Sequence, residues 1–274
     1  PKYAADCSEL VSDCLYHGDP LIGTDGQTYF SSNKAYMYET VSWDQIAPGD
    51  ALAKTGHTMI FVDVSGENIT TIEQKGNGDD GGALFWQGNG GTVVNITCRA
   101  NLAGDVGGSI FIFGSNLTFT NSKFMLSNAT TNGGAIYIYG NNVLINDSSF
   151  DKCSANNEHG GAIYAAGLNT TISKSIFTMN MVNVTAEAHG GSIDIQGNNT
   201  HILDCTFEKC NAFEGGVVYV SGSNAVLENL SCIYSFATKG GAFYIEGDDA
   251  TLSNINASHN NATDYGGAIY VAGN

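Results

Sequence analysis

The sequence contains few positively charged residues. Of its 274 residues only 10 are Lys or Arg, against 27 Asp or Glu, and Arg99 is the sole arginine. Proteins that bind nucleic acid rely on several cationic side chains to neutralise phosphates. A chain with a formal net charge of −17 is therefore not expected to bind nucleic acid.

Long apolar runs are also missing. No stretch approaches the roughly 20 consecutive apolar residues that a membrane-spanning helix needs, so we expect no membrane span in this chain. Charged residues make up 14% of the sequence and apolar residues 42%, which is unlike the composition of disordered chains. We expect a folded protein that is long enough for two domains.

Glycine is abundant, and its spacing defines a repeat. The pair Gly-Gly recurs eight times, and each time another Gly follows seven residues after the first of the pair, so that the repeat accounts for 24 of the 35 glycines. The pairs begin at residues 81, 107, 133, 160, 190, 215, 240 and 266. Self-similarity at a period of about 26 residues is typical of a solenoid.

Apolar residues occupy fixed positions within each repeat. Counted from the first Gly, positions 3 and 5 are apolar, as period-two strands require. Further apolar positions follow at 12 and 17, separated by Gly and Asn corners that tolerate positive φ. Three short strands per repeat predict an all-β, right-handed parallel β-helix of seven to eight coils over residues 76–274, which we expect to continue beyond the C-terminus.

Five of the seven cysteines lie within the repeats. Cys98 and Cys232 occupy position 17, where other coils have Phe, while Cys153 and Cys210 share position 20. A thiol in place of Phe is most simply a small buried apolar side chain. Neither pair lies in adjacent coils, so the usual disulfide geometry is out of reach. We expect buried thiols and not a disulfide framework.

Position 4 of the repeat is mostly aromatic and is expected to point outward from the first strand. Polysaccharide-cleaving enzymes need paired carboxylates, which this stripe does not offer. A tyrosine ladder can bind sugar or protein, although stacking between neighbouring strands is the simpler interpretation. The residues are Phe111, Tyr137, Tyr164, Asp194, Tyr219, Tyr244 and Tyr270.

Two histidines precede Gly pairs in successive coils. His159 and His189 can share a metal ion with Glu158 or Glu187, but solvent-exposed corner residues are the simpler interpretation. We accordingly expect no metal and no other cofactor.

The first 75 residues lie outside the repeat and carry a different pattern. Asp6 is a good N-cap, and Glu9 completes a capping box ahead of an apolar helix face. The pattern predicts a helix that has Cys7 in its first turn, where the helix dipole and exposed N–H groups favour a thiolate. Gly18 and Pro20 are expected to end this helix.

A histidine begins the next predicted strand. His57 opens an apolar strand over residues 57–64, and a second strand is expected over residues 68–74. A three-residue loop between them places His57 opposite Glu73, whereas a two-residue loop places it opposite Gln74. We favour Glu73 as the residue that orients the imidazole and keep Gln74 as the alternative.

The order of these features resembles the NlpC/P60 and CHAP superfamily of papain-like cysteine peptidases and amidases. The shared features are a cysteine at a helix start, the turn Pro-Gly-Asp at residues 48–50, a strand-initial histidine and a polar residue on the paired strand. The resemblance implies a small α+β papain-like domain over residues 1–75, incomplete at its N-terminus, that cuts cell-wall peptides. It also implies that Cys7 is the nucleophile, His57 the base, and Glu73 or Gln74 the orienting residue.

The motif Gly-Gly-Ala-Ile at residues 133–136, 160–163 and 266–269 resembles the repeats of chlamydial polymorphic outer-membrane proteins and of adhesin-like surface proteins of methanogenic archaea. Together the resemblances imply an extracellular cell-wall-associated hydrolase. Its partner would be peptidoglycan or pseudomurein, or a host surface glycan or protein that the β-helix contacts. The alternative is a non-enzymatic adhesin or surface-structural protein with an inactive peptidase-like head.

Overall fold

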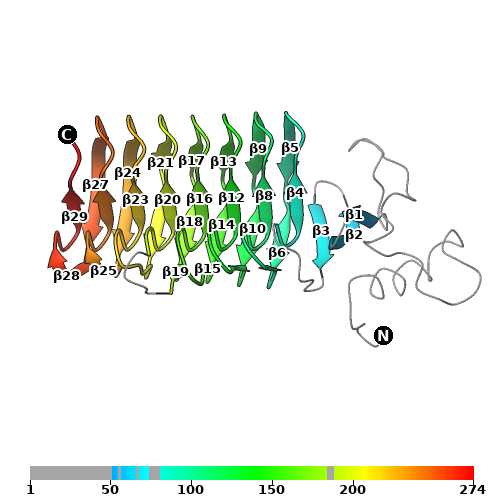
Figure 1. The fold of residues 1–274 in the computed structure, drawn as a ribbon, viewed down its shortest axis with the longest axis horizontal. Helices are drawn as coiled ribbons and strands as arrows, with labels where there is room; N and C mark the ends of the chain where they lie inside the picture. Colours follow the sequence, from blue (N-terminus) through cyan, green and yellow to red (C-terminus); the bar gives the residue numbers. More distant parts are fainter. Residues whose placement is uncertain (1–50, 55–56, 66–67, 74–80, 184–187) are drawn as a thin grey trace, which may run out of the picture.

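The computed structural model describes residues 51–54, 57–65, 68–73, 81–183 and 188–274 (Figure 1). The helix predicted to begin at Asp6, and with it Cys7, lies outside these residues, as does Gln74. Within the described residues all the regular secondary structure is β-strand. The repeats form a parallel β-solenoid of about seven turns, which confirms the fold predicted for this part of the chain.

The first strand of each coil joins one eight-stranded parallel sheet that runs the length of the solenoid (Figure 1). Equivalent repeat positions pair across neighbouring coils, for example Ile136 with Ile163. The strands are β4 (Leu84–Trp86), β8 (Ile110–Ile112), β12 (Ile136–Ile138), β16 (Ile163–Ala165), β20 (Ile193–Ile195), β23 (Val218–Val220), β26 (Phe243–Ile245) and β29 (Ile269–Val271).

The second and third strands of the coils belong to a single 15-stranded sheet. The second strands are β5 (Gly91–Val94), β9 (Leu117–Thr120), β13 (Leu144–Asn146), β17 (Thr171–Ser173) and β21 (His201–Leu203). The third strands are β6 (Thr97–Arg99), β10 (Lys123–Met125), β14 (Ser149–Asp151), β18 (Ile176–Thr178) and β22 (Thr206–Glu208). Toward the C-terminus the two merge into the longer strands β24 (Val226–Ile233) and β27 (Thr251–Ser258).

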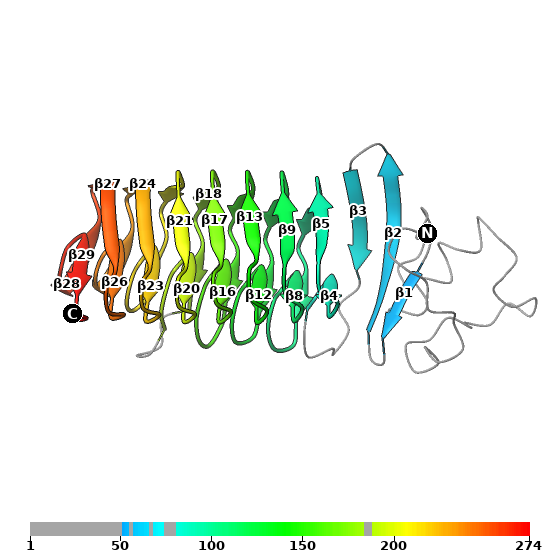
Figure 2. The ribbon, with the colours of Figure 1, turned by 90° about the horizontal axis from the view of Figure 1, so that it is seen from above.

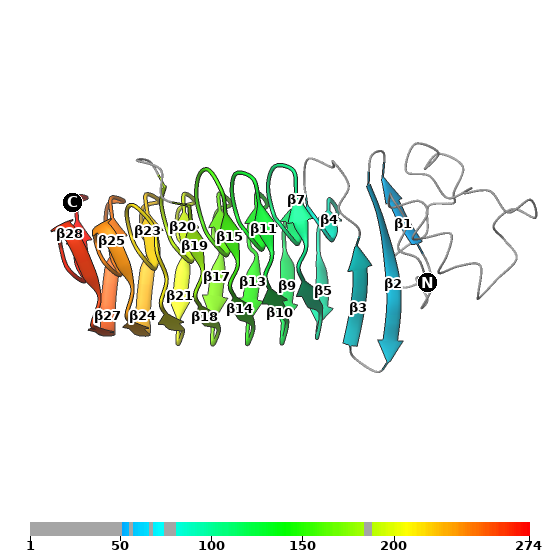
Figure 3. The ribbon, with the colours of Figure 1, turned by 90° about the horizontal axis from the view of Figure 1, so that it is seen from below.

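A short fourth strand, which the sequence pattern did not reveal, is present in most coils (Figure 3). Because many of these strands are only two residues long, they are too short to show period-two alternation. The strands are β7 (Leu102–Ala103), β11 (Asn128–Ala129), β15 (Ser154–Ala155), β19 (Met181–Val182), β25 (Phe236–Lys239) and β28 (Asn261–Tyr265).

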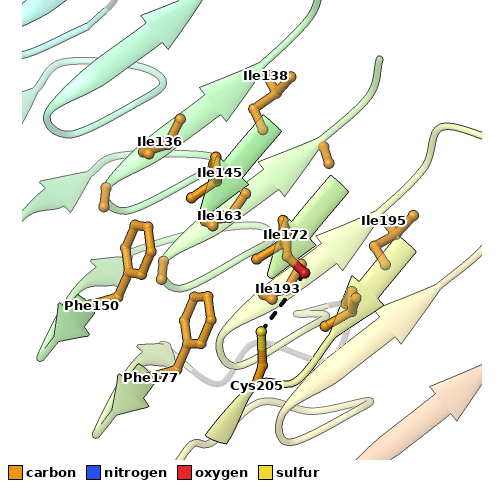
Figure 4. Packing of buried hydrophobic residues seen from close by; sticks show 14 of the residues in the cluster. Ile136, Ile138, Ile145, Phe150, Ile163, Ile172, Phe177, Ile193, Ile195 and Cys205 are labelled. Atoms are coloured by element: carbon orange, nitrogen blue, oxygen red, sulfur yellow. Dashed lines mark hydrogen bonds between the residues drawn. The ribbon is translucent and has the colours of Figure 1, made fainter. Parts of the chain in front are cut away.

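Side chains from the sheets fill the interior (Figure 4). Ile136 and Ile138 of the first strand, Ile145 of the second and Phe150 of the third are all buried, as the repeat positions predict. Burying an Ile or Phe side chain contributes roughly 1.5–3 kcal/mol. The same four positions are apolar in the seven coils that begin at residues 81 to 240, so the core is a continuous column through these coils.

The corners between strands use residues in the left-handed region. In one coil these are Asn142 with φ 56°, Asp147 with φ 51° and Lys152 with φ 53°. Asn tolerates this conformation well. Its amide also links coils, because Asn142 Nδ2 donates to Asn116 Oδ1 at 3.0 Å and Asn169 Nδ2 donates to Asn142 Oδ1 at 2.9 Å. The corner Asn residues thus fix both the turn and the spacing of the coils.

Three antiparallel strands continue the large sheet beyond the first coil (Figure 2). They are β1 (Ala51–Lys54), β2 (His57–Ser65) and β3 (Asn68–Glu73). β3 pairs with β6 in parallel through Thr70 and Thr97. The two strands predicted from the sequence are present, and they are attached to the solenoid by strand pairing.

Candidate functional site

The backbone register places two of the three predicted catalytic residues. His57 is the first residue of β2 and Glu73 the last residue of β3. The Cα partner of Glu73 is Met59, and the partner of His57 is Lys54 of β1. The strand register therefore differs by two residues from the predicted one, which paired His57 with Glu73.

The position of the turn explains this difference in register. The last pair of the hairpin is Ser65 with Asn68, so the turn lies further along the chain than either predicted loop, and this alone shifts the predicted register by three residues. The register shifts back by one residue between Phe61 and Asp63, which leaves the net difference of two. A β-bulge of this kind leaves no clear mark in an apolar run, because it inserts one residue without changing the composition.

The aromatic stripe at position 4 is covered over part of its length and half-buried over the rest, so it is less exposed than an outward-facing ladder was expected to be. Phe111, Tyr219 and Tyr244 are each at most 8% exposed. Several side chains that precede a Gly pair lie against this column. The His189 ring stacks on Tyr219 with centroids 4.1 Å apart, and Lys239 Nζ lies 5.9 Å from the centroid of the Tyr244 ring. Because Tyr137, Tyr164 and Tyr270 are only half-buried, the covered part of the stripe belongs to the wall of the solenoid, and the stripe is not a continuous open binding surface.

Asp194 interrupts this aromatic column and is fully buried. It lies in β20 between Tyr164 of β16 and Tyr219 of β23. Gln196 Nε2 donates a hydrogen bond to Asp194 Oδ1 at 2.6 Å, whereas Oδ2 has no hydrogen-bond partner among the described residues. Burial raises the pKa of Asp194 to about 8, because desolvation penalises the carboxylate.

His159 and His189 lie over Asp194 from adjacent coils. They form an isolated parallel bridge, and their rings stack with centroids 4.6 Å apart. The Nδ1 atom of each ring is 3.9 Å from Asp194 Oδ2. Both imidazoles keep about a fifth of their surface exposed, at 23% and 21%. The two rings therefore separate a buried carboxylate oxygen from the solvent.

Further charged groups surround His189. Its Nε2 lies 3.4 Å from Glu214 Oε2, and Glu214 Oε1 in turn lies 2.7 Å from Lys239 Nζ. The His189 backbone N–H donates to His159 Nδ1 at 3.3 Å. Burial, followed by the neighbouring His159, lowers the pKa of His189 to about 4. Neutral imidazole, the form that binds metals, is thus the favoured state of His189.

The sequence suggested that these two histidines share a metal ion with Glu158 or Glu187, and not with Asp194. Glu158 instead accepts a hydrogen bond from Asn132 Nδ2 at 2.8 Å, and Glu187 lies outside the described residues. Within the described ranges, the sole group of three or more His, Cys, Asp or Glu residues whose ligand atoms all lie within 4.8 Å of one another consists of His159, His189 and Asp194. Asp194 could have been recognised as a candidate ligand from the sequence, because it is the one acidic residue at a repeat position that is otherwise aromatic.

The cysteines of the repeats are buried, as predicted. Cys98, Cys153, Cys205, Cys210 and Cys232 are at most 1% exposed, and no disulfide joins them. Burial raises the pKa of Cys153 to about 12 and that of Cys210 to about 11. A nucleophilic cysteine needs an accessible thiolate, and these buried, protonated thiols do not provide one.

Comparison of the chain with known protein families, with curated proteins and with solved structures finds no match. In the part of the chain that the structure describes, no helix is long and apolar enough to cross a membrane.

Proposed function

We propose that this chain is an extracellular, cell-wall-associated protein in which the β-solenoid is a stalk for a papain-like cysteine peptidase or amidase head. The supporting observation is the strand pairing between β3 and β6 through Thr70 and Thr97. The segment that begins at His57 is held against the end of the solenoid by this pairing. A head attached in this way would be presented at a fixed position on the stalk.

In this proposal the chemistry belongs to Cys7 and His57. The Cys7 thiolate attacks the carbonyl carbon of a wall peptide, and the backbone N–H at the predicted helix start stabilises the oxyanion. His57 takes the thiol proton and returns it to the leaving amine, and water then releases the acyl group from the sulfur. Because Met59 faces Glu73, an orienting role for Glu73 requires a diagonal approach to His57.

The test is release of peptide fragments from isolated peptidoglycan and isolated pseudomurein. Cys7→Ala and His57→Ala should each abolish release, whereas Cys14→Ala, in the same predicted helix, should retain it. Glu73→Gln should lower turnover more than Gln74→Ala if Glu73 orients the imidazole. Absence of turnover on both polymers by the intact protein would contradict the hydrolase proposal.

A non-enzymatic adhesin or surface-structural protein is the second candidate. It is favoured by the hairpin register, which pairs Met59 and not His57 with Glu73, and by an exposed aromatic pair on the solenoid. Phe113 and Tyr139 at position 6 stack with centroids 5.2 Å apart, and they are 46% and 57% exposed. Half-exposed aromatic rings are frequent contacts for sugars and proteins.

Sedimentation with insoluble wall polymer tests this second candidate. The double variant Phe113→Ser and Tyr139→Ser should weaken binding, while the matched variant Ile176→Ser and Met179→Ser, at other exposed apolar positions, should not. Binding by the intact protein without any turnover would favour the adhesin over the hydrolase. Equal binding by both double variants would exclude the aromatic pair as the attachment surface.

A further inference from the structure

We propose that His159, His189 and Asp194 form a binding site for one divalent transition-metal ion of the zinc type. The site lies where the corner before β20 crosses the first-strand sheet, and it is independent of the proposed hydrolase and adhesin functions. Three observations carry the proposal: an unpartnered buried carboxylate oxygen, two imidazole Nδ1 atoms that lie 3.9 Å from it, and outer partners that orient these groups.

The buried oxygen is the first observation. Asp194 is fully buried, and its Oδ2 has no hydrogen-bond partner among the described residues, although its Oδ1 is bonded to Gln196. A buried polar atom without a partner is costly and rare in folded proteins. The aromatic residues at this position in neighbouring coils, Tyr164 and Tyr219, show that the fold itself does not require an acid here. Packing of the column therefore does not by itself account for the carboxylate.

The convergence of ring nitrogens is the second observation. The Nδ1 atoms of His159 and His189 both lie 3.9 Å from the same Oδ2. This distance is too long for a hydrogen bond. Ligands at about 2.1 Å from a tetrahedral zinc ion are about 3.4 Å apart. Shortening each Nδ1–Oδ2 separation by about 0.5 Å would reach this value. The two Nδ1 atoms lie within 4.8 Å of each other and their rings are stacked with planes 18° apart, so binding must include a ring rotation that turns both lone pairs toward the ion.

The tautomer of His189 follows from its outer partner. Its Nε2 lies 3.4 Å from Glu214 Oε2, so a proton on Nε2 is directed at a carboxylate and the lone pair of Nδ1 is left to face Asp194. A nitrogen lone pair and a carboxylate oxygen repel each other unless a cation lies between them. One proton can bridge only one such contact, whereas a single metal ion accepts both imidazoles and the carboxylate at once.

The outer partners form a second layer that is typical of metal sites. Metal-binding histidines usually donate their other N–H to a carboxylate, and metal-binding carboxylates are themselves hydrogen-bonded. Glu214 has this role for His189 and is held by Lys239 at 2.7 Å. Gln196 is the outer partner of Asp194, because its side-chain amide donates a hydrogen bond to Asp194 Oδ1. At His159, coordination through Nδ1 would replace the long 3.3 Å hydrogen bond that this atom accepts from the His189 N–H.

The donor set indicates the class of ion. Two imidazoles and one carboxylate suit zinc and its neighbours in the transition series better than magnesium or calcium, which prefer oxygen ligands. Three protein ligands leave one position for water. His159 and His189 keep 23% and 21% of their side-chain surface exposed, so the site lies one imidazole ring below the solvent.

The experiment titrates Zn²⁺ into the full-length chain after removal of metals by a chelator, and measures stoichiometry and affinity by calorimetry. Co²⁺ is used in parallel, because its visible absorption reports imidazole ligation and coordination number. Wild-type protein should bind one equivalent of Zn²⁺ that is lost, or weakened at least 100-fold, in His189→Ala, His159→Ala and Asp194→Asn. Glu214→Gln should weaken binding by about 10- to 100-fold.

His201→Ala is the matched control, because His201 is exposed in the neighbouring strand β21 outside the cluster, and its binding should equal that of the wild type. The Zn²⁺ binding that is lost in the variants is the binding at this site, as distinct from binding by other residues such as those among the first 80. Circular dichroism of the metal-free variants checks that the solenoid is folded, and Asp194→Asn, which keeps the side-chain shape, is the decisive variant. Unchanged Zn²⁺ stoichiometry and affinity in folded Asp194→Asn, or no binding by the wild type at micromolar Zn²⁺, would overturn the proposal.

Discussion

The rings of Phe150 and Phe177 are parallel, with centroids 4.7 Å apart and planes 3° apart. This separation equals the spacing of paired strands, so the backbone ladder sets the stack. Phe124 and Phe207 extend the column on either side, each 4.8 Å from its neighbour. An inner ring of the column therefore contacts an aromatic ring in the coil before it and another in the coil after it.

Removal of an inner ring should be strongly destabilising. Phe177→Ala leaves a cavity between two coils and should lower the free energy of unfolding by about 3–5 kcal/mol. Tyr139→Ala, which removes a ring that is 57% exposed, should cost less than about 1 kcal/mol. Chemical denaturation of both variants checks this difference. Similar losses in the two variants would mean that the Phe column contributes no more than a surface stack.

The second Gly of each pair is predicted to be required by close approach of the next coil. A Cβ on Gly134 would lie 2.1 Å from the Gly161 carbonyl oxygen, a backbone atom that cannot rotate away. Gly134→Ala should therefore cost at least about 1–3 kcal/mol or prevent folding. Gly267 occupies the same repeat position in the last coil and has no atom within 4 Å of such a Cβ. Measured on residues 1–274, where no further coil packs on it, Gly267→Ala should leave the unfolding midpoint unchanged. An equal loss there would contradict the steric explanation.

These glycines also show why the solenoid could be predicted from the sequence. Each coil repeats the same steric requirements, so residues such as Gly134 and Phe177 recur at fixed positions and reveal the strand faces without any long-range information. The fourth strand escaped detection because two residues cannot establish a period. The exposure predicted for the position-4 column was also wrong at Tyr219 and Tyr244, which are buried. The residues that cover them, such as His189, come from a corner whose direction the repeat does not specify.

The candidate metal site was only half visible in the sequence. His159 and His189 stand at equivalent positions of adjacent coils, so their proximity could be predicted. Asp194 lies only five residues after His189, but whether its side chain meets the two rings depends on how the corner folds back over β20. The register of β2 and β3 was likewise set by a bulge and a turn position that an apolar run does not encode.

Non-glycine residues in the left-handed region offer a route to higher stability. Leu126 has φ 55° and is 46% exposed, so it carries the steric cost of this conformation with little burial in return. Leu126→Asn should raise the free energy of unfolding by about 1 kcal/mol, because Asn adopts this region more easily. Leu168 is similarly exposed and has no positive φ, so Leu168→Asn is the control and should be neutral. Thermal unfolding compares the two, and a destabilised Leu126→Asn would contradict the strain argument.

Cysteine reactivity separates the predicted nucleophile from the structural thiols. Burial raises the pKa of Cys153 to about 12 and that of Cys210 to about 11, so both should remain protonated and unreactive toward iodoacetamide from pH 6 to pH 9. The proposed function places Cys7 at a helix start beside the His57 imidazole, so its pKa should be lowered and it should be alkylated at pH 6. Unfolding should expose all thiols and bring them to ordinary reactivity, with labelling that rises as the pH approaches 9. Peptide mass mapping of native and denatured samples measures each site, and equal labelling of all cysteines in the native protein would remove both assignments.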